Sequence, residues 1–262
     1  MPFVDIPGAR IWYQDSGGHG TPVVFVHPAA ASSECWVNQV PALTAAGFRC
    51  VTYDLRGWHR SKPLPDAPDP GCLSDDLEAL VQGLGLGRFV LVAAAYGGFG
   101  AFDYALRFPD RLQALVVATS QGGIADPEYM AVLGRVVTPP VRALPIEIRE
   151  LGPSYRAENP DGVERWLQIV HEAGGEKAGR QRPALTLTLS LLESLRVPSL
   201  LLAADADLLA PPALMRLMAA RIPGCEFATV ADAGHSAHWE RPEAWNRIVL
   251  DFAKRRAGRR GS

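Results

Sequence analysis

Short runs of hydrophobic residues alternate with longer helical patterns along the first 120 residues of the chain. The runs Thr21–His27 and Phe89–Ala95 are almost continuously apolar, which is typical of strands that are buried on both faces. Strands that alternate with helices in this order predict crossover connections and a mostly parallel sheet that helices cover on both faces. The expected strands are Ala9–Gln14, Thr21–His27, Arg49–Asp54, Phe89–Ala95 and Leu115–Ala118, and the expected helices are Ser33–Ala46, Ser74–Leu86 and Tyr96–Phe108.

The pattern changes between Gln121 and about Arg196, where prolines interrupt the helical stretches and no strong strand pattern is present. A structureless loop of this length is uncommon inside a compact domain, so the segment is predicted to be a helical insertion. We therefore expect an α/β core domain of residues 1–120 and 197–262 and a helical cap or lid of residues 121–196. In the second part of the core we expect Ser199–Ala203 and Glu226–Val230 as strands and Pro212–Arg221 and Pro242–Arg256 as helices.

Composition and charge narrow the classes of function. Hydrophobic residues make up 48% of the 262 residues and charged residues 21%, which is typical of a globular chain, and the net charge of -2 gives no electrostatic reason to expect nucleic acid. The four cysteines form no Cys-x-x-Cys pair, so we expect reduced thiols and no metal site. Without a signal-peptide pattern or a run of about 18 apolar residues, we expect a cytoplasmic protein that does not bind membranes.

Polar residues and glycines follow the predicted strands at their carboxyl ends, where ligands bind in open α/β sheets. One strand ends in His27-Pro28-Ala29-Ala30, and the strand after it ends at Asp54. The next strand ends in Ala95-Tyr96-Gly97-Gly98, directly at the start of a helix. The last two strands end in Asp205-Ala206-Asp207 and in Asp232-Ala233-Gly234-His235.

Together these fragments resemble the α/β-hydrolase family, and the resemblance covers nearly the whole chain apart from the insertion. The matching pieces are His27-Pro28, the run Tyr53–Ser61, the turn before Gly97-Gly98, Asp207 with Pro211, and the run Ala233–Glu243. The acid and the histidine occur in the order typical of this family. The resemblance implies the α/β-hydrolase fold, with a mostly parallel central sheet, helices on both faces and a helical cap insertion.

The resemblance also implies roles for individual residues. His235 would be the general base, and Asp207 would accept its other ring N–H; Asp205 is a rival, but the spacing from the acid to the proline favours Asp207. The backbone N–H groups of Ala29 and Tyr96 would form the oxyanion hole. No cofactor and no metal are implied.

Position 95 departs from the family motif G-x-S-x-G, because Ala95 stands where the family has its nucleophilic serine. Removing this nucleophile from a triad costs about a millionfold in turnover, so the chain as written is expected to be inactive as a hydrolase. Three explanations stay open. The chain is a deliberately inactivated form of a hydrolase, a natural hydrolase-like protein that binds a small ligand without cleaving it, or a cofactor-free lyase or oxygenase that uses His235 and Asp207.

The active form would attack a small-molecule ester or lactone, and the resemblance extends to carboxylesterases, enol-lactonases and hydrolases that cleave the C–C bond of ring-fission products. A homodimer is compatible with the sequence. Arg156 is a candidate to hold a substrate carboxylate through a forked pair of hydrogen bonds, although a solvated helix surface also explains it. Core packing explains the aromatic candidates equally well. The candidate substrate-binding residues are Trp36, His59, Phe99, Tyr155, Arg156 and Trp166.

Overall fold

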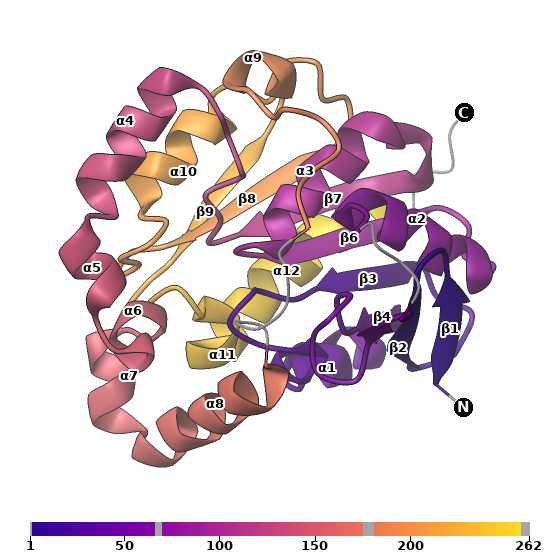
Figure 1. Cartoon of the computed structure of the whole chain (residues 1–262), viewed down its shortest axis with the longest axis horizontal. Helices are drawn as coiled ribbons and strands as arrows, with labels where there is room; N and C mark the ends of the chain where they lie inside the picture. Colours follow the sequence, from indigo (N-terminus) through magenta and orange to yellow (C-terminus); the bar gives the residue numbers. More distant parts are fainter. Residues whose placement is uncertain (1, 66–69, 175–180, 258–262) are drawn as a thin grey trace.

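The computed structural model describes residues 2–65, 70–174 and 181–257 of the chain (Figure 1). Nine strands of this part form one sheet: β1 (Phe3–Ile6), β2 (Ala9–Asp15), β3 (Pro22–Val26), β4 (Arg49–Tyr53), β5 (Lys62–Pro63), β6 (Phe89–Ala94), β7 (Leu112–Ala118), β8 (Ser199–Ala204) and β9 (Glu226–Val230). Their order in the sheet is β1-β2-β4-β3-β6-β7-β8-β9, with β5 paired to β2.

All neighbouring strands from β4 to β9 are parallel, whereas β2 runs antiparallel to β1, β4 and β5. Every residue of β6 and β8 is buried. This burial agrees with the continuous apolar runs in the sequence, since a strand that helices cover on both sides has no solvent-facing positions. The prediction of a mostly parallel sheet within an α/β fold is therefore confirmed.

The structure differs from the predicted elements at three places. The strands β1 and β5 at the edge of the sheet were not predicted. The helix predicted over Ser33–Ala46 is interrupted, because a 3₁₀ turn (Ser33–Trp36) precedes the short helix α1 (Gln39–Ala45). The Asp54 carboxylate accepts hydrogen bonds from the N–H and the hydroxyl of Ser33, at 3.0 and 2.6 Å, and thereby fixes this turn against β4.

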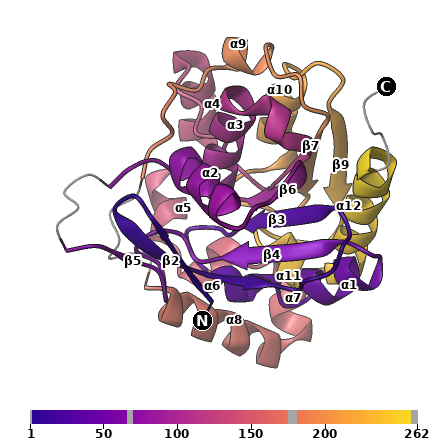
Figure 2. The same ribbon diagram turned by 90° about the vertical axis from the view of Figure 1, so that its right-hand side faces the viewer.

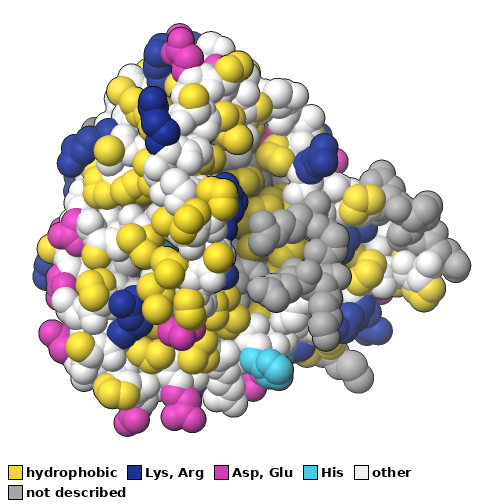
Figure 3. Space-filling view, turned by 60° about the vertical axis from the view of Figure 1, so that its left-hand side comes forward, with side chains coloured by type: hydrophobic (Ala, Val, Ile, Leu, Met, Phe, Trp, Pro, Cys, Tyr) yellow, Lys and Arg dark blue, Asp and Glu magenta, His cyan; other side chains and the backbone are white. Residues whose placement is uncertain are grey.

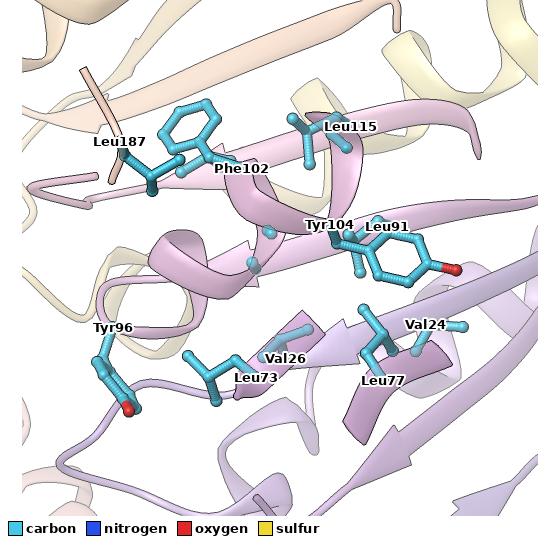
Figure 4. Packing of buried hydrophobic residues seen from close by; sticks show 14 of the residues in the cluster. Val24, Val26, Leu73, Leu77, Leu91, Tyr96, Phe102, Tyr104, Leu115 and Leu187 are labelled. Carbon is cyan, nitrogen blue, oxygen red and sulfur yellow. The ribbon is translucent and has the colours of Figure 1, made fainter. Parts of the chain in front are cut away.

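Helices cover the two faces of the sheet (Figure 2). Alternate residues of β3 belong to different hydrophobic clusters: Val24 and Val26 pack with α2 (Leu73–Gly83), α3 (Gly97–Arg107) and α10 (Pro212–Ala219), as Figure 4 shows for α2 and α3. Val23 and Phe25 pack with the cluster of α1 and α12 (Pro242–Ala257) on the opposite face. The short helix α11 (Ala237–Glu240) lies just before α12 in the chain.

Between β7 and β8, the described part of the chain forms helices and no strand; we call residues 121–196 the cap segment. Figure 1 shows its helices α4–α8 along one side of the molecule. None of the helices in the three described ranges is both long and apolar enough to span a bilayer. The helices of the cap segment are α4 (Pro127–Val136), α5 (Pro139–Ala143), α6 (Ile146–Glu150), α7 (Pro153–Glu158), α8 (Pro160–Ala173) and α9 (Leu189–Leu192).

Candidate active site

A cavity of about 650 Å³ lies between the carboxyl ends of the strands and the cap segment. This is the position at which open α/β sheets bind ligands. We call its two sides the core half and the cap half. The core half is lined by Pro28, Ala29, Ala30, Ala95, Tyr96, Phe99, Gln121, Leu209 and His235, and the cap half by Val137, Arg142, Ile146, Arg149, Glu150, Leu167, Val170, His171 and Gly174.

Ala95 lies on a sharp turn between β6 and α3, and its backbone has a φ of +48°. Residues other than glycine rarely adopt this left-handed conformation, which costs about 1–3 kcal/mol and persists only where the surroundings fix it. The turn is fixed by its hydrogen bonds. The Ala95 N–H donates to the Ala118 carbonyl at 3.0 Å, and the Ala95 carbonyl accepts from the buried Ser120 hydroxyl at 2.6 Å.

Two glycines after Ala95 make this turn sterically feasible. A Cβ added at Gly97 would lie 2.6 Å from the Val26 carbonyl oxygen, and one added at Gly98 would lie 2.5 Å from the Ser120 Oγ. Both distances are shorter than any ordinary contact, so α3 approaches β3 and β7 as closely as it does only because these side chains are absent. The sequence therefore builds a strained turn that points the side chain of residue 95 into the cavity.

His235 and Asp207 meet at the same cavity. His235 Nδ1 lies 2.9 Å from each carboxylate oxygen of Asp207, and both side chains are buried. The Asp207 carboxylate also accepts the N–H groups of Leu209 and Ala210, at 2.7 and 2.9 Å, which fix its orientation. The rival acid Asp205 does not contact the imidazole, since its carboxylate accepts the N–H of Asp232 at 2.8 Å.

The electrostatic surroundings of His235 favour its protonated form. Burial lowers the pKa of the imidazole, but the negative charges of Asp207, Glu150 and Glu240 outweigh this effect and raise the pKa to about 9. The ring N–H at Nδ1 donates to Asp207, so Nε2 is the nitrogen left to exchange a proton with a group in the cavity.

Two glutamates near His235 were not predicted from the sequence. The Glu240 carboxylate accepts the N–H of Gly234 at 3.0 Å and the N–H of Gly152 at 2.7 Å, so it links the histidine loop to the cap segment. Glu150 lines the cavity, and its carboxylate accepts the Ser236 hydroxyl at 3.2 Å. Burial raises the pKa of Glu150 and raises that of Glu240 to about 7. Glu240 lies in the run Ala233–Glu243, so a signal for it was present; Glu150 had none.

The two expected oxyanion residues, Ala29 and Tyr96, both line the cavity beside Ala95. His27 orients the loop that carries Ala29. Its Nδ1–H donates to the Pro28 carbonyl at 2.8 Å, and its Nε2 accepts the Leu55 N–H at 2.9 Å. Burial lowers the pKa of His27, so the imidazole is neutral and can make both bonds at once.

The structure separates the aromatic candidates. Phe99 lines the cavity, with its ring centroid 5.6 Å from that of Tyr96. Trp36 and Trp166 are fully buried against His238 and do not line the cavity, and Tyr155 is buried beneath α8 beside Asn159. His59 binds the carbonyl of Glu172 at 3.1 Å, so it contacts the end of α8 instead of the cavity.

Arg156 also lies outside the cavity lining. Its guanidinium donates to the carbonyl oxygens of Ile148 and Leu151 and thereby stabilises the backbone around the end of α6. The cavity instead receives Arg142 from α5 and Arg149 from α6. The helices of the cap segment are too short for the sequence to show which of their arginines would face inward.

Comparisons with known proteins agree with the α/β fold described above. A family model described as "Alpha/beta hydrolase family" matches residues 23–248. A thermophilic esterase from Thermogutta terrifontis, solved with malate bound, is 28% identical, with a TM-score of 0.75 over 97% of each chain. An enol-lactonase from Burkholderia xenovorans LB400 is 25% identical, with a TM-score of 0.80 over 97% of this chain and 100% of that one.

A hydrolase of another kind is among the curated relatives. It is a 2-hydroxy-6-oxononadienedioate/2-hydroxy-6-oxononatrienedioate hydrolase from Burkholderia vietnamiensis, 25% identical in an alignment that covers 94% of this chain and 91% of the relative. The similar proteins thus include an esterase, a lactonase and a hydrolase of a ketodiacid.

Proposed function

The chain belongs to the alpha/beta hydrolase family, and on this premise we propose that its site is built to hydrolyse a carboxylic ester or lactone through a Ser-His-Asp triad, with alanine at the nucleophile position 95. The chain as it stands then binds its substrate without cleaving it. The observation that carries the proposal is the strained backbone of Ala95, at φ +48°, which lines the same cavity as His235.

The proposed mechanism applies to a serine at position 95. His235 Nε2 takes the hydroxyl proton as the oxygen attacks the substrate carbonyl, while Asp207 stabilises the imidazolium. The N–H groups of Ala29 and Tyr96 bind the oxyanion. The imidazolium then protonates the leaving alcohol, and a water molecule, activated by the same imidazole, releases the acid and regenerates the hydroxyl.

The retention of the strained turn supports this proposal. The left-handed backbone of Ala95 costs about 1–3 kcal/mol and persists only where the surroundings fix it, and strain of this kind clusters at active sites and ligand-binding sites. The relatives support the bond type, since an esterase and an enol-lactonase both act on a carbonyl attached to oxygen. The residues of the cap segment complete the cavity, and we propose that they act as its lid.

The test is to convert Ala95→Ser and to measure release of p-nitrophenol from p-nitrophenyl acetate, together with opening of a small lactone followed by pH-stat. We expect turnover in Ala95→Ser and none above background in the parent chain. The matched control is the double substitution Ala95→Ser with His235→Ala, which keeps the hydroxyl but removes the base and should abolish turnover again.

Two outcomes would overturn the proposal. If Ala95→Ser folds normally but is inert on a broad panel of esters and lactones, the site belongs to a binding protein. If the parent chain itself transforms a substrate and His235→Ala stops it, the site performs acid–base chemistry without a nucleophile.

A further inference from the structure

We propose that Arg149, with Arg142 beside it in the cap half, forms a subsite for a substrate carboxylate. This inference rests on the proposed function, because it places the reacting carbonyl at Ala95. The substrate class becomes an ester or lactone whose acyl part ends in a carboxylate, such as the monoester of a short dicarboxylic acid.

The first support is the lack of a partner for the Arg149 guanidinium. Its Nε is buried and makes no hydrogen bond, and among the described residues no carboxylate lies within 4.0 Å of the group. The buried Arg56, by contrast, is paired with Asp76 at 2.6 Å. A guanidinium is always charged, and its parallel N–H groups match a carboxylate in a bidentate geometry.

The second support is the position of the two arginines in the cavity. Both line the cap half, whereas Ala95, Tyr96 and Ala29 line the core half of the same cavity. The proposed ligand then has its ester at the turn and its carboxylate against the guanidinium groups. The Arg142 Nε–H donates to the Val137 carbonyl oxygen at 3.3 Å, so the two terminal nitrogens of this guanidinium can donate to a ligand.

Glu150, the neighbour of Arg149 in sequence, interacts with its charge at longer range, because Arg149 counteracts the rise in the pKa of Glu150 that burial causes. The Glu150 carboxylate faces His235 and accepts the Ser236 hydroxyl, and it forms no ion pair with Arg149 within the part of the chain that the structure describes. Figure 3 shows the side of the molecule that carries the cap segment, where yellow hydrophobic side chains lie among dark blue cationic and magenta acidic ones. In the cavity itself, apolar side chains such as Val137, Ile146 and Val170 line the same half as the two arginines, which suits a ligand with an apolar middle and an anionic end.

Hydrolysis by the Ala95→Ser form provides the first test. The substrates are monomethyl adipate and methyl hexanoate, which share the reacting ester and differ mainly in the carboxylate. We expect Ala95→Ser to prefer monomethyl adipate in kcat/KM. In that background Arg149→Met should lose about 10–100-fold on monomethyl adipate and much less on methyl hexanoate, so that the ratio of the two kcat/KM values falls. Arg149→Lys should keep part of the preference. Arg135→Met, which removes an exposed arginine of α4, is the control and should keep all of it.

Binding to the chain as it exists separates this inference from the proposed function. Calorimetric titration of the Ala95 chain with monomethyl adipate should show binding that Arg149→Met weakens and Arg135→Met does not. If Ala95→Ser is inert but this binding holds, the subsite stands and the hydrolase proposal fails. If Ala95→Ser cleaves both esters equally, and Arg149→Met changes neither binding nor rate, the subsite is refuted and the hydrolase proposal stands.

Discussion

The two halves of the cavity are built in different ways. In the core half, Ala95 and His235 follow strands β6 and β9, whose backbones are fixed by the hydrogen-bonded sheet. In the cap half, Arg142 and Arg149 lie on α5 and α6, which are five residues long each. Helices of this length are not stable alone, so tertiary packing decides which of their side chains face the cavity.

This difference leads us to expect separate roles for the two halves, a division of labour between reaction chemistry in the core half and ligand selection in the cap half. The core half holds its polar groups through short buried bonds, such as the 2.9 Å contact between His235 and Asp207, and this precision is what bond-breaking chemistry requires. The cap half offers apolar side chains, Glu150 and two guanidinium groups. We propose that the guanidinium groups bind the end of the substrate that lies away from the reacting atoms. Changes in the core half should therefore alter the rate for every substrate. Changes in the cap half should alter the choice of substrate, except at Glu150, whose charge raises the pKa of His235.

The largest effect is expected from Asp207→Asn in the Ala95→Ser background. The amide cannot stabilise the imidazolium or hold the same tautomer of His235, so kcat should fall about 10⁴-fold. The matched change in the cap half, His171→Gln, should leave kcat on p-nitrophenyl acetate nearly unchanged. Comparable losses in both variants would contradict the division of labour.

The next effect concerns pH, because only neutral imidazole can accept the serine proton. The raised pKa of His235, about 9, means that kcat/KM of Ala95→Ser should rise about tenfold from pH 7 to 8 and about fivefold from pH 8 to 9. Asp207, Glu150 and Glu240 raise this pKa, and the neighbouring His238 remains neutral because burial lowers its own pKa to about 3. Glu150→Gln should move the midpoint to lower pH, because it removes one of the negative charges that raise the pKa of His235. A midpoint near pH 6.5 that Glu150→Gln does not change would show that Glu150 has no effect on this pKa.

The smallest effect is on stability. Gly97→Ala places a methyl group 2.6 Å from the Val26 carbonyl and should lower the free energy of unfolding by about 1–3 kcal/mol. Gly134→Ala in α4 of the cap segment is the matched control, since a Cβ there meets nothing within 4 Å and should stabilise the helix by about 0.5–1 kcal/mol. Urea unfolding measures both changes. Equal midpoints for the two variants would mean that the turn at Ala95 tolerates a wider approach of α3.

The core of the fold could be predicted from the sequence because parallel strands that are buried on both faces consist of nearly continuous apolar residues. The predicted ends of β3, β6 and β8 lie within one residue of their observed ends. Strand β1 was missed because it is a short edge strand whose residues are mostly half-exposed, and β5 because it has two residues.

The residues of the candidate site that follow strands could also be predicted from the sequence. Ala95, Asp207 and His235 follow predicted strands, and the topology of a parallel sheet brings such positions together whatever the helices between them do. Arg149 and Glu150 could not be predicted, since they lie on a helix bounded by Pro145 and Pro153 whose orientation depends on contacts distant in sequence. For Trp36 and Trp166 the sequence left packing and ligand binding open, and the structure places both rings in the packed interior.

The turn at residue 95 has one more consequence. Its bend, its two glycines and its carbonyl bond to Ser120 would all serve a serine without change. Serine differs from alanine by a single oxygen on Cβ. The Cβ of Ala95 already occupies the position from which a serine hydroxyl would enter the cavity. If the proposed function holds, a single oxygen atom separates an inert binding pocket from a reactive one, and the observed backbone serves both.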